Sequence, residues 1–202
     1  IMRLPIFFNT NRIQDIPRNI PYIAPDESLI NTWSEDISPD PYLKVGICWR
    51  GSHKHGNDKH RSIPDASMLA PLINTPGSHF YSLQVGMTKD DAHWLETMPT
   101  ITDLGQKISD FADTAAIIAQ LDLVITVDTA VAHLAGALGK PVWVLLPSHQ
   151  VDWRWLQDRS DSPWYPEKMR LFRKKPGESW TTLLEEIQIE LTRQKTPHGF
   201  PS

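Results

Sequence analysis

The chain has 202 residues, of which 40% are hydrophobic and 22% charged, and its formal net charge is −4. These values are typical of a soluble globular protein and give no overall positive field that would attract nucleic acid or anionic lipid. No apolar stretch approaches the roughly 20 residues needed to span a bilayer. The single cysteine, Cys48, excludes an intramolecular disulfide framework and lies in an apolar run, which predicts a buried thiol. With no signal-peptide pattern at its start, we expect a cytoplasmic protein.

Residues 1–42 differ from the rest of the chain. They hold six of the 17 prolines and show no sustained hydrophobic period of two or of 3.6 residues. Such a stretch is too poor in regular pattern to build a compact domain alone. We therefore expect 1–42 to form a proline-rich N-terminal arm or interdomain connection that lies on a neighbouring structure.

From Leu43 onward, apolar runs alternate with amphipathic segments. Strands are predicted at 43–49, 79–84, 101–104, 123–127, 142–146 and 169–173, and helices at 64–73, 88–97, 110–121, 130–138 and 180–195. This alternation is typical of a doubly wound α/β domain with a Rossmann-like parallel sheet. We assign the domain to residues 43–195 and a C-terminal tail to 196–202.

The clearest unit is LDLVITVDTAVAHLAGALGKPVWVLLP, residues 121–147. A buried strand passes through Asp128 and Thr129 directly into a helix of small residues, which Gly139 and Pro141 then end. In a βαβ unit such a helix begins at the carboxyl end of its strand, where α/β sheets bind ligands. We expect Asp128 to cap the helix through its side chain. The unpaired N–H groups and positive dipole end of the helix favour an anion, most plausibly a phosphate.

The candidate anion-binding residues at this helix start are Thr129, Ala130 and Val131, with His133 one turn further along the same face as Thr129. The positive end of the helix disfavours protonation of His133, which predicts a neutral hydrogen-bonding imidazole. The alternative is an ordinary helix start with a core histidine that is satisfied by a backbone carbonyl.

A second candidate region follows the first strand, in WRGSHKHGNDKHRSIP, residues 49–64. This cationic loop opens on the same edge of the sheet, so Arg61 or Lys59 is placed to pair with phosphate oxygens. Its three histidines (His53, His55 and His60) leave open a metal site, and a plain solvated loop is the remaining alternative. Neither GxxxxGK[ST] nor GxGxxG occurs, which argues against a P-loop and against a dinucleotide dehydrogenase.

These segments together resemble a known family. Four of them look like the C-terminal half of GT-B glycosyltransferases: VGICWRGSHKHGNDKHRSIP, FYSLQ, DFADTAAIIAQLDLVITVDTAVAHLAGALGKPVWVLLP and DWRWLQDRSDSPWYPEKMRLFRK. They are similar to the heptosyltransferase-like family, in the branch often fused behind tetratricopeptide repeats. The resemblance covers about residues 43–195, and the segments MRLPIFF and IPRNIPYIAP resemble the connection from the N-terminal domain.

The resemblance implies that the C-terminal domain binds the nucleoside diphosphate of a sugar donor. It places Asp128, Thr129 and the following helix on the diphosphate, with His133 nearby and Arg61 on phosphate. Gln84 would line the nucleotide pocket, where we also place Arg50 and Lys59. No Asp-x-Asp occurs in the sequence, and the resemblance implies transfer without a metal ion or other cofactor.

The catalytic base of this family generally comes from the N-terminal domain, for which residues 1–42 are too few. The catalytic residue is therefore unknown, and we expect either a fragment of a larger enzyme or a natural truncation, with a missing N-terminal domain or a second copy of the chain as its partner. The acceptor and the sugar are undetermined. A non-catalytic sugar-nucleotide-binding or protein-interaction module is the alternative function, and a metal-dependent hydrolase that uses the histidine loop is a third.

Overall fold

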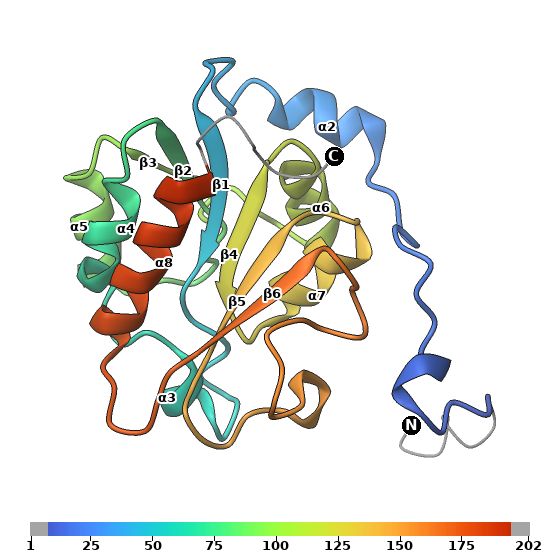
Figure 1. Ribbon diagram of the computed structural model, residues 1–202. Coiled ribbons are helices and arrows are strands. Elements are labelled where there is room, and N and C mark those ends of the chain that lie inside the picture. The colour runs from blue at the N-terminus through green and yellow to red at the C-terminus, as the bar shows by residue number, and fades with distance from the viewer. Residues whose placement is uncertain (1–7, 195–202) are drawn as a thin grey trace.

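The computed structural model describes residues 8–194. Six strands form one parallel sheet in the order β3-β2-β1-β4-β5-β6 (Figure 1). The strands are β1 (Leu43–Cys48), β2 (Ser78–Ser82), β3 (Ile101–Asp103), β4 (Leu123–Val127), β5 (Val142–Leu146) and β6 (Met169–Arg173). This order is that of the doubly wound Rossmann sheet, so the predicted fold class is confirmed.

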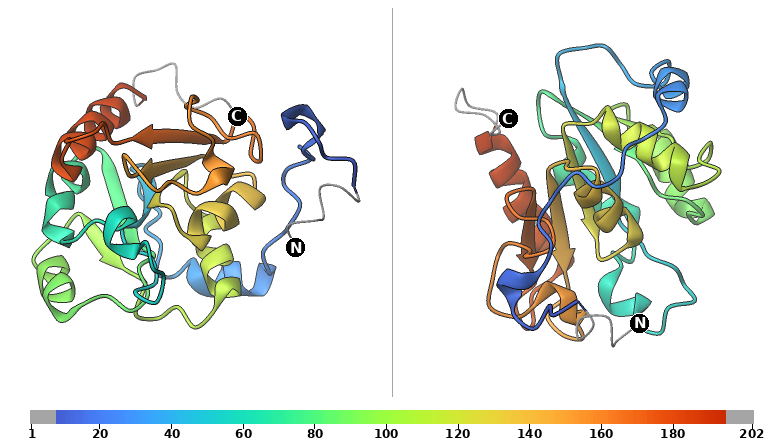
Figure 2. Two further views of the ribbon diagram at one scale, coloured as in Figure 1. Left: turned by 90° about the horizontal axis from the view of Figure 1, so that it is seen from below. Right: turned by 90° about the vertical axis from the view of Figure 1, so that its right-hand side faces the viewer.

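Helices cover both faces of the sheet (Figure 2). The α-helices are α2 (Glu27–Trp33), α3 (Asp58–Arg61), α4 (Ala70–Ile73), α5 (Lys89–Glu96), α6 (Phe111–Ala119), α7 (Ala130–Ala137) and α8 (Trp180–Gln194); short 3-10 turns are η1 (Ile13–Asp15), η2 (Ala66–Leu69) and η3 (Trp153–Trp155). Among residues 8–194, every helix is too short or too polar to cross a membrane.

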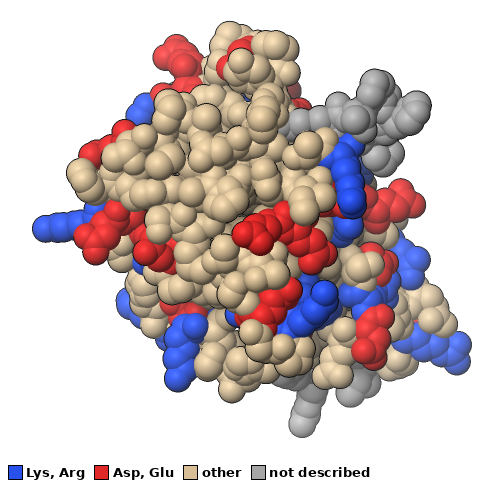
Figure 3. Space-filling model, turned by 60° about the vertical axis from the view of Figure 1, so that its left-hand side comes forward, with Lys and Arg blue, Asp and Glu red and all other residues tan. Residues whose placement is uncertain are grey.

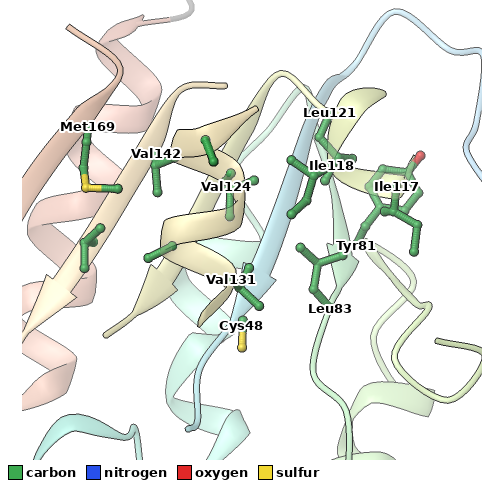
Figure 4. Close-up of a cluster of buried hydrophobic side chains, with 14 of the residues drawn as sticks. Cys48, Tyr81, Leu83, Ile117, Ile118, Leu121, Val124, Val131, Val142 and Met169 are labelled. Atoms are coloured by element: carbon green, nitrogen blue, oxygen red, sulfur yellow. The ribbon is translucent and has the colours of Figure 1, made fainter. Parts of the chain in front are cut away.

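Two buried clusters correspond to the two faces. One joins the sheet to α6, α7 and α2, and the other joins it to η2, α4 and α8. Figure 4 shows part of the first cluster, in which Val131 of α7 lies close to Cys48 at the end of β1. The predicted buried thiol is therefore confirmed. The apolar face of α8 is also confirmed, since Leu183, Leu184, Ile187 and Leu191 are all buried.

The structure differs from the predicted elements in several places, and one of them is the short helix α3 within the predicted loop 49–64. The predicted helix 64–73 is divided into η2 and α4, with Pro71 in the first turn of α4. A helix that we did not predict, α2, lies in the proline-rich segment 1–42 and packs against α6, where Trp33 Nε1 donates to Asp113 Oδ1 at 3.0 Å. The predicted tail 196–202 lies outside the described residues.

The proline-rich segment also contacts the end of α7. Tyr22 N donates to the Ala137 carbonyl oxygen at 3.0 Å, and Pro21 lies beside Gly139, whose φ of +73° fits the predicted helix stop. We use the term strap for residues 20–22.

On the face shown in Figure 3, charges of both signs are scattered around a broad uncharged area, so this face has no field of a single sign.

Candidate diphosphate-binding site

A cavity of about 1160 Å³ opens at the carboxyl ends of the strands. Its walls come from the connections after β1, β2, β4 and β5, together with the start of α6. Strands β1 and β4 are neighbours, paired from Val45–Leu123 to Cys48–Thr126, but their following connections lead to opposite faces of the sheet. This divergence is the topological switch point at which doubly wound sheets bind ligands.

The start of α7 forms one wall of this cavity. Thr129 is the N-cap residue, not Asp128, so the predicted capping role of the Asp128 side chain is wrong. Among residues 8–194, no side chain caps this helix, because Thr129 Oγ1 lies instead 3.0 Å from Thr126 Oγ1. Ala130 and Val131 line the cavity. Their position leaves first-turn N–H groups of the helix available to an anion.

Arg61 lies next to this helix start. Its Nη1 donates to the carbonyl oxygen of Asp128 at 2.9 Å, and its Nε lies 3.7 Å from Asp58 Oδ1. The guanidinium packs on Gly51, where an added Cβ would come within 2.4 Å of Nη2. The Arg61 side chain is only 13% exposed, so its charge is held at the cavity by contacts rather than free in solvent.

The side chain of Asp128 also faces the cavity. Burial raises the pKa of this carboxyl above its ordinary value, while Trp155, Arg61 and His133 act in the opposite direction. The Asp128 main chain thus positions Arg61, whereas its carboxylate is a partly desolvated acceptor beside the helix start.

His133 lies one turn into α7 and lines the same cavity. Its Nδ1 is 3.1 Å from the Tyr165 hydroxyl, and its ring stacks on Trp155 with centroids 5.0 Å apart and planes at 16°. Burial is the main cause that lowers the pKa of His133, so the imidazole is neutral at neutral pH.

The aromatic residues around His133 belong to the connection between β5 and β6. Arg173 fixes this connection, because its Nη2 donates to the Trp155 carbonyl oxygen at 2.6 Å and its Nε to the Arg159 carbonyl oxygen at 3.3 Å. Trp155 is fully buried, and Leu156 after it has a φ of +54°. A branched side chain adopts that conformation only when its surroundings enforce it, so the connection is tightly built.

Arg50 and Gln84 touch the cavity, but their polar groups are engaged within the protein. Gln84 Oε1 accepts from the backbone N–H groups of Arg50 at 2.8 Å and Trp49 at 3.2 Å. The Arg50 guanidinium pairs with Asp91 at 2.9 Å and donates to the carbonyl oxygens of Ile63 and Pro64. Lys59 is exposed on α3 and is not among the residues that line the cavity.

The three loop histidines are held apart by different partners. His53 Nδ1 lies 3.4 Å from Asp58, His55 Nδ1 accepts from Asn57 N, and the His60 ring packs edge-on against His149. Within the described range 8–194, no three His, Cys, Asp or Glu side chains gather as a potential metal-binding set.

The floor of the cavity includes Cys48, and burial raises the pKa of its thiol to about 11. The thiol is therefore protonated at neutral pH and unreactive as a nucleophile. No local pattern in the sequence indicates Tyr165 as a site residue, because its contact with His133 joins positions 32 residues apart.

The comparisons with known proteins agree with this fold. Residues 92–168, from α5 to the end of the aromatic connection, match the model of glycosyltransferase family 9 (heptosyltransferase). This stretch of the chain therefore resembles glycosyltransferase family 9. Protein FlbA of Caulobacter vibrioides is 29% identical over 188 residues, which cover 87% of this chain and 29% of that protein.

Three solved glycosyltransferase structures share the fold of this chain. E. coli ADP-heptose lps heptosyltransferase II superposes with a TM-score of 0.59 and 20% identity, over 89% of this chain and 55% of that one. A glycosyl transferase family 9 protein from Veillonella parvula gives 0.54 and 16%, over 86% and 45%. E. coli heptosyltransferase WaaC, solved with ADP, gives 0.53 and 13%, over 89% and 53%. The chain thus spans about half of each of these solved chains.

Proposed function

We propose that this chain binds the diphosphate of a nucleoside diphosphate sugar, as the donor-binding half of a metal-independent glycosyltransferase. The observation that carries the proposal is the position of Arg61 on the carbonyl oxygen of Asp128, beside the uncapped start of α7 in a large cavity. A guanidinium and a helix N-terminus that face the same space form a binding site for a dianionic group.

The same groups suit the chemistry of glycosyl transfer. When the bond between the anomeric carbon and the phosphate breaks, negative charge grows on the leaving diphosphate. Fixed N–H donors and a cation that are already in place stabilise that charge without reorganising. Neutral His133 is positioned to donate or accept a hydrogen bond at the same ligand.

The acceptor and the catalytic base are assigned to a second domain, since the chain spans about half of its solved structural relatives. A non-catalytic module that only binds the sugar nucleotide would use the same cavity. Turnover separates the two functions: the enzyme half transfers sugar once an N-terminal half and an acceptor are supplied, whereas the binding module does not.

Calorimetric titration with ADP, UDP and GDP at low salt tests the binding step. We expect at least one of the three to bind, and Arg61→Ala to weaken that binding about 10- to 100-fold, as expected for a lost charge-assisted contact. Arg170→Ala is the matched control, because Arg170 of β6 pairs with Glu190 of α8 and does not line the cavity. If no diphosphate binds, or if both variants behave alike, the proposal is wrong.

A further inference from the structure

The hydroxyl of Tyr165 lies between two partners, one in the cavity wall and one in the strap. It is 3.1 Å from His133 Nδ1 and 3.4 Å from the Tyr22 hydroxyl. The Tyr165 side chain is buried, with an exposed fraction of 5%, whereas Tyr22 is 60% exposed. The three side chains therefore form a hydrogen-bonded row from the surface of the strap to the imidazole.

The position of this hydroxyl is fixed by packing. The Tyr165 ring lies directly on Gly136 of α7, where an added Cβ would come within 2.5 Å of its Cγ. Gly136 follows His133 by three residues, so both contacts of Tyr165 fall on one face of the helix. One face of the His133 ring stacks on the indole of Trp155. The imidazole is thus held both on one face and at its Nδ1 edge.

The row of hydroxyls has a preferred direction. A phenol is a better donor than acceptor, and an unprotonated imidazole nitrogen is a strong acceptor. The arrangement Tyr22 O–H to Tyr165 O–H to Nδ1 also lets each hydrogen bond polarise the next. With Nδ1 as the acceptor, the proton of the neutral ring must be on Nε2.

We propose that Tyr165 is a positioning residue that holds His133 in its Nε2–H form, so that the ring presents an N–H donor to the cavity. This role rests on the proposed function, because the acceptor for that N–H is an oxygen of the bound diphosphate sugar. Burial keeps both partners in the required protonation states: it lowers the pKa of His133 and raises the pKa of Tyr165.

The tautomer is measurable without any ligand. In protein labelled with ¹⁵N-histidine, two-bond ¹H–¹⁵N correlations at pH 7.5 distinguish the Nδ1–H and Nε2–H forms, and a His133→Gln sample identifies the signals. We expect the Nε2–H form in the wild-type chain and a mixture of both forms in Tyr165→Phe. A wild-type ring in the Nδ1–H form overturns the proposal, and this result does not depend on how well any variant folds.

Binding supplies the second readout. Tyr165→Phe should weaken binding of the diphosphate that the wild-type chain prefers among ADP, UDP and GDP by about three- to tenfold. Tyr22→Phe is the matched control: it also removes a phenol hydroxyl, but one that contacts Tyr165 rather than the imidazole. It should leave His133 in its Nε2–H form. If Tyr165→Phe changes neither tautomer nor affinity, the proposal is wrong. If the wild-type chain binds no diphosphate, the proposed function fails, while the tautomer still decides the role of Tyr165.

Discussion

Arg61 donates a hydrogen bond from Nη1 to the carbonyl oxygen of Asp128, across 67 positions of sequence and between the connections that follow β1 and β4. The bond joins the two neighbouring strands of the switch point on the ligand side of the sheet. It also places a positive charge beside first-turn N–H groups of α7, which is the arrangement on which the proposed site depends.

A methyl group on residue 51 tests the position of this guanidinium without removing its charge. In Gly51→Ala, the new Cβ would lie 2.4–2.9 Å from three atoms of the Arg61 guanidinium, which must move away. We expect diphosphate binding about tenfold weaker in calorimetric titration. Gly56→Ala is the matched control in the same loop, since its Cβ would meet nothing within 4 Å. Equal affinities of the two variants would show that the position of Arg61 does not matter.

Gln84 should prove more important for stability than for binding. In Gln84→Leu, the buried N–H groups of Trp49 and Arg50 lose their acceptor, so we expect a loss of about 2–4 kcal/mol in the free energy of unfolding. Urea unfolding measures this loss. Gln106→Leu, at an exposed position that pairs with Asp103, should change it by less than about 0.5 kcal/mol. A Gln84 variant of normal stability would contradict the structural role.

Gly136→Ala separates helix propensity from packing. Propensity alone predicts a gain of about 1 kcal/mol for alanine within a helix. The contact with the Tyr165 ring predicts the opposite, a loss of about 1–3 kcal/mol from overpacking. Thermal unfolding gives the sign. The loss should shrink in a Tyr165→Val background, where the ring is absent, and a higher Tm for Gly136→Ala alone would contradict the packing.

Protonation of His133 should lower stability on the acid side. Because burial holds its pKa in the folded state below the ordinary value of 6.5, the unfolded chain takes up this proton first as the pH falls. The loss of stability therefore begins near pH 6.5 and continues down to the pKa of the folded state. We expect urea unfolding at pH 7.5 and 5.5 to show a larger decrease for wild type than for His133→Gln.

His60 and Asp128 also have shifted pKa values that affect the pH dependence of stability. The pKa of His60 is also lowered, but its effect is common to both proteins and cancels. The pKa of Asp128 is raised, so its ionised form costs stability above that pKa and the cost disappears as the pH falls. Its sign is opposite to that of His133, and Asp128→Asn measured at the same pH values isolates it. Equal pH dependence of wild type and His133→Gln would contradict the burial of the imidazole.

The sequence allowed the sheet and the place of the cavity to be predicted, because both depend on local signals. Buried parallel strands appear as apolar runs, and Gly139 with Pro141 marks the end of α7. Helix α2 was missed because seven residues give too short a periodic signal, although Asp26 caps it with Oδ1 bonds to Ser28 and Leu29.

The details of the site depend on contacts between distant segments, which a single sequence does not contain. Asp128 and Thr129 are both good capping residues, but the structure makes Thr129 the N-cap and turns its hydroxyl to Thr126, so neither side chain caps α7. Similarly, Arg50 and Arg61 have the same chemistry in sequence. Their difference comes from their partners: Arg50 pairs closely with Asp91, whereas Arg61, which lies further from Asp58, donates to the Asp128 carbonyl oxygen at the helix start.

The hydrogen bond from Arg173 to the Trp155 carbonyl oxygen makes the shape of the cavity wall depend on a residue of β6. Arg173 is not among the lining residues, yet it anchors the backbone of Trp155, whose indole stacks on His133. A mutational scan of ligand affinity should therefore recover an arginine on a peripheral strand, and a search restricted to groups in reach of the ligand would overlook it.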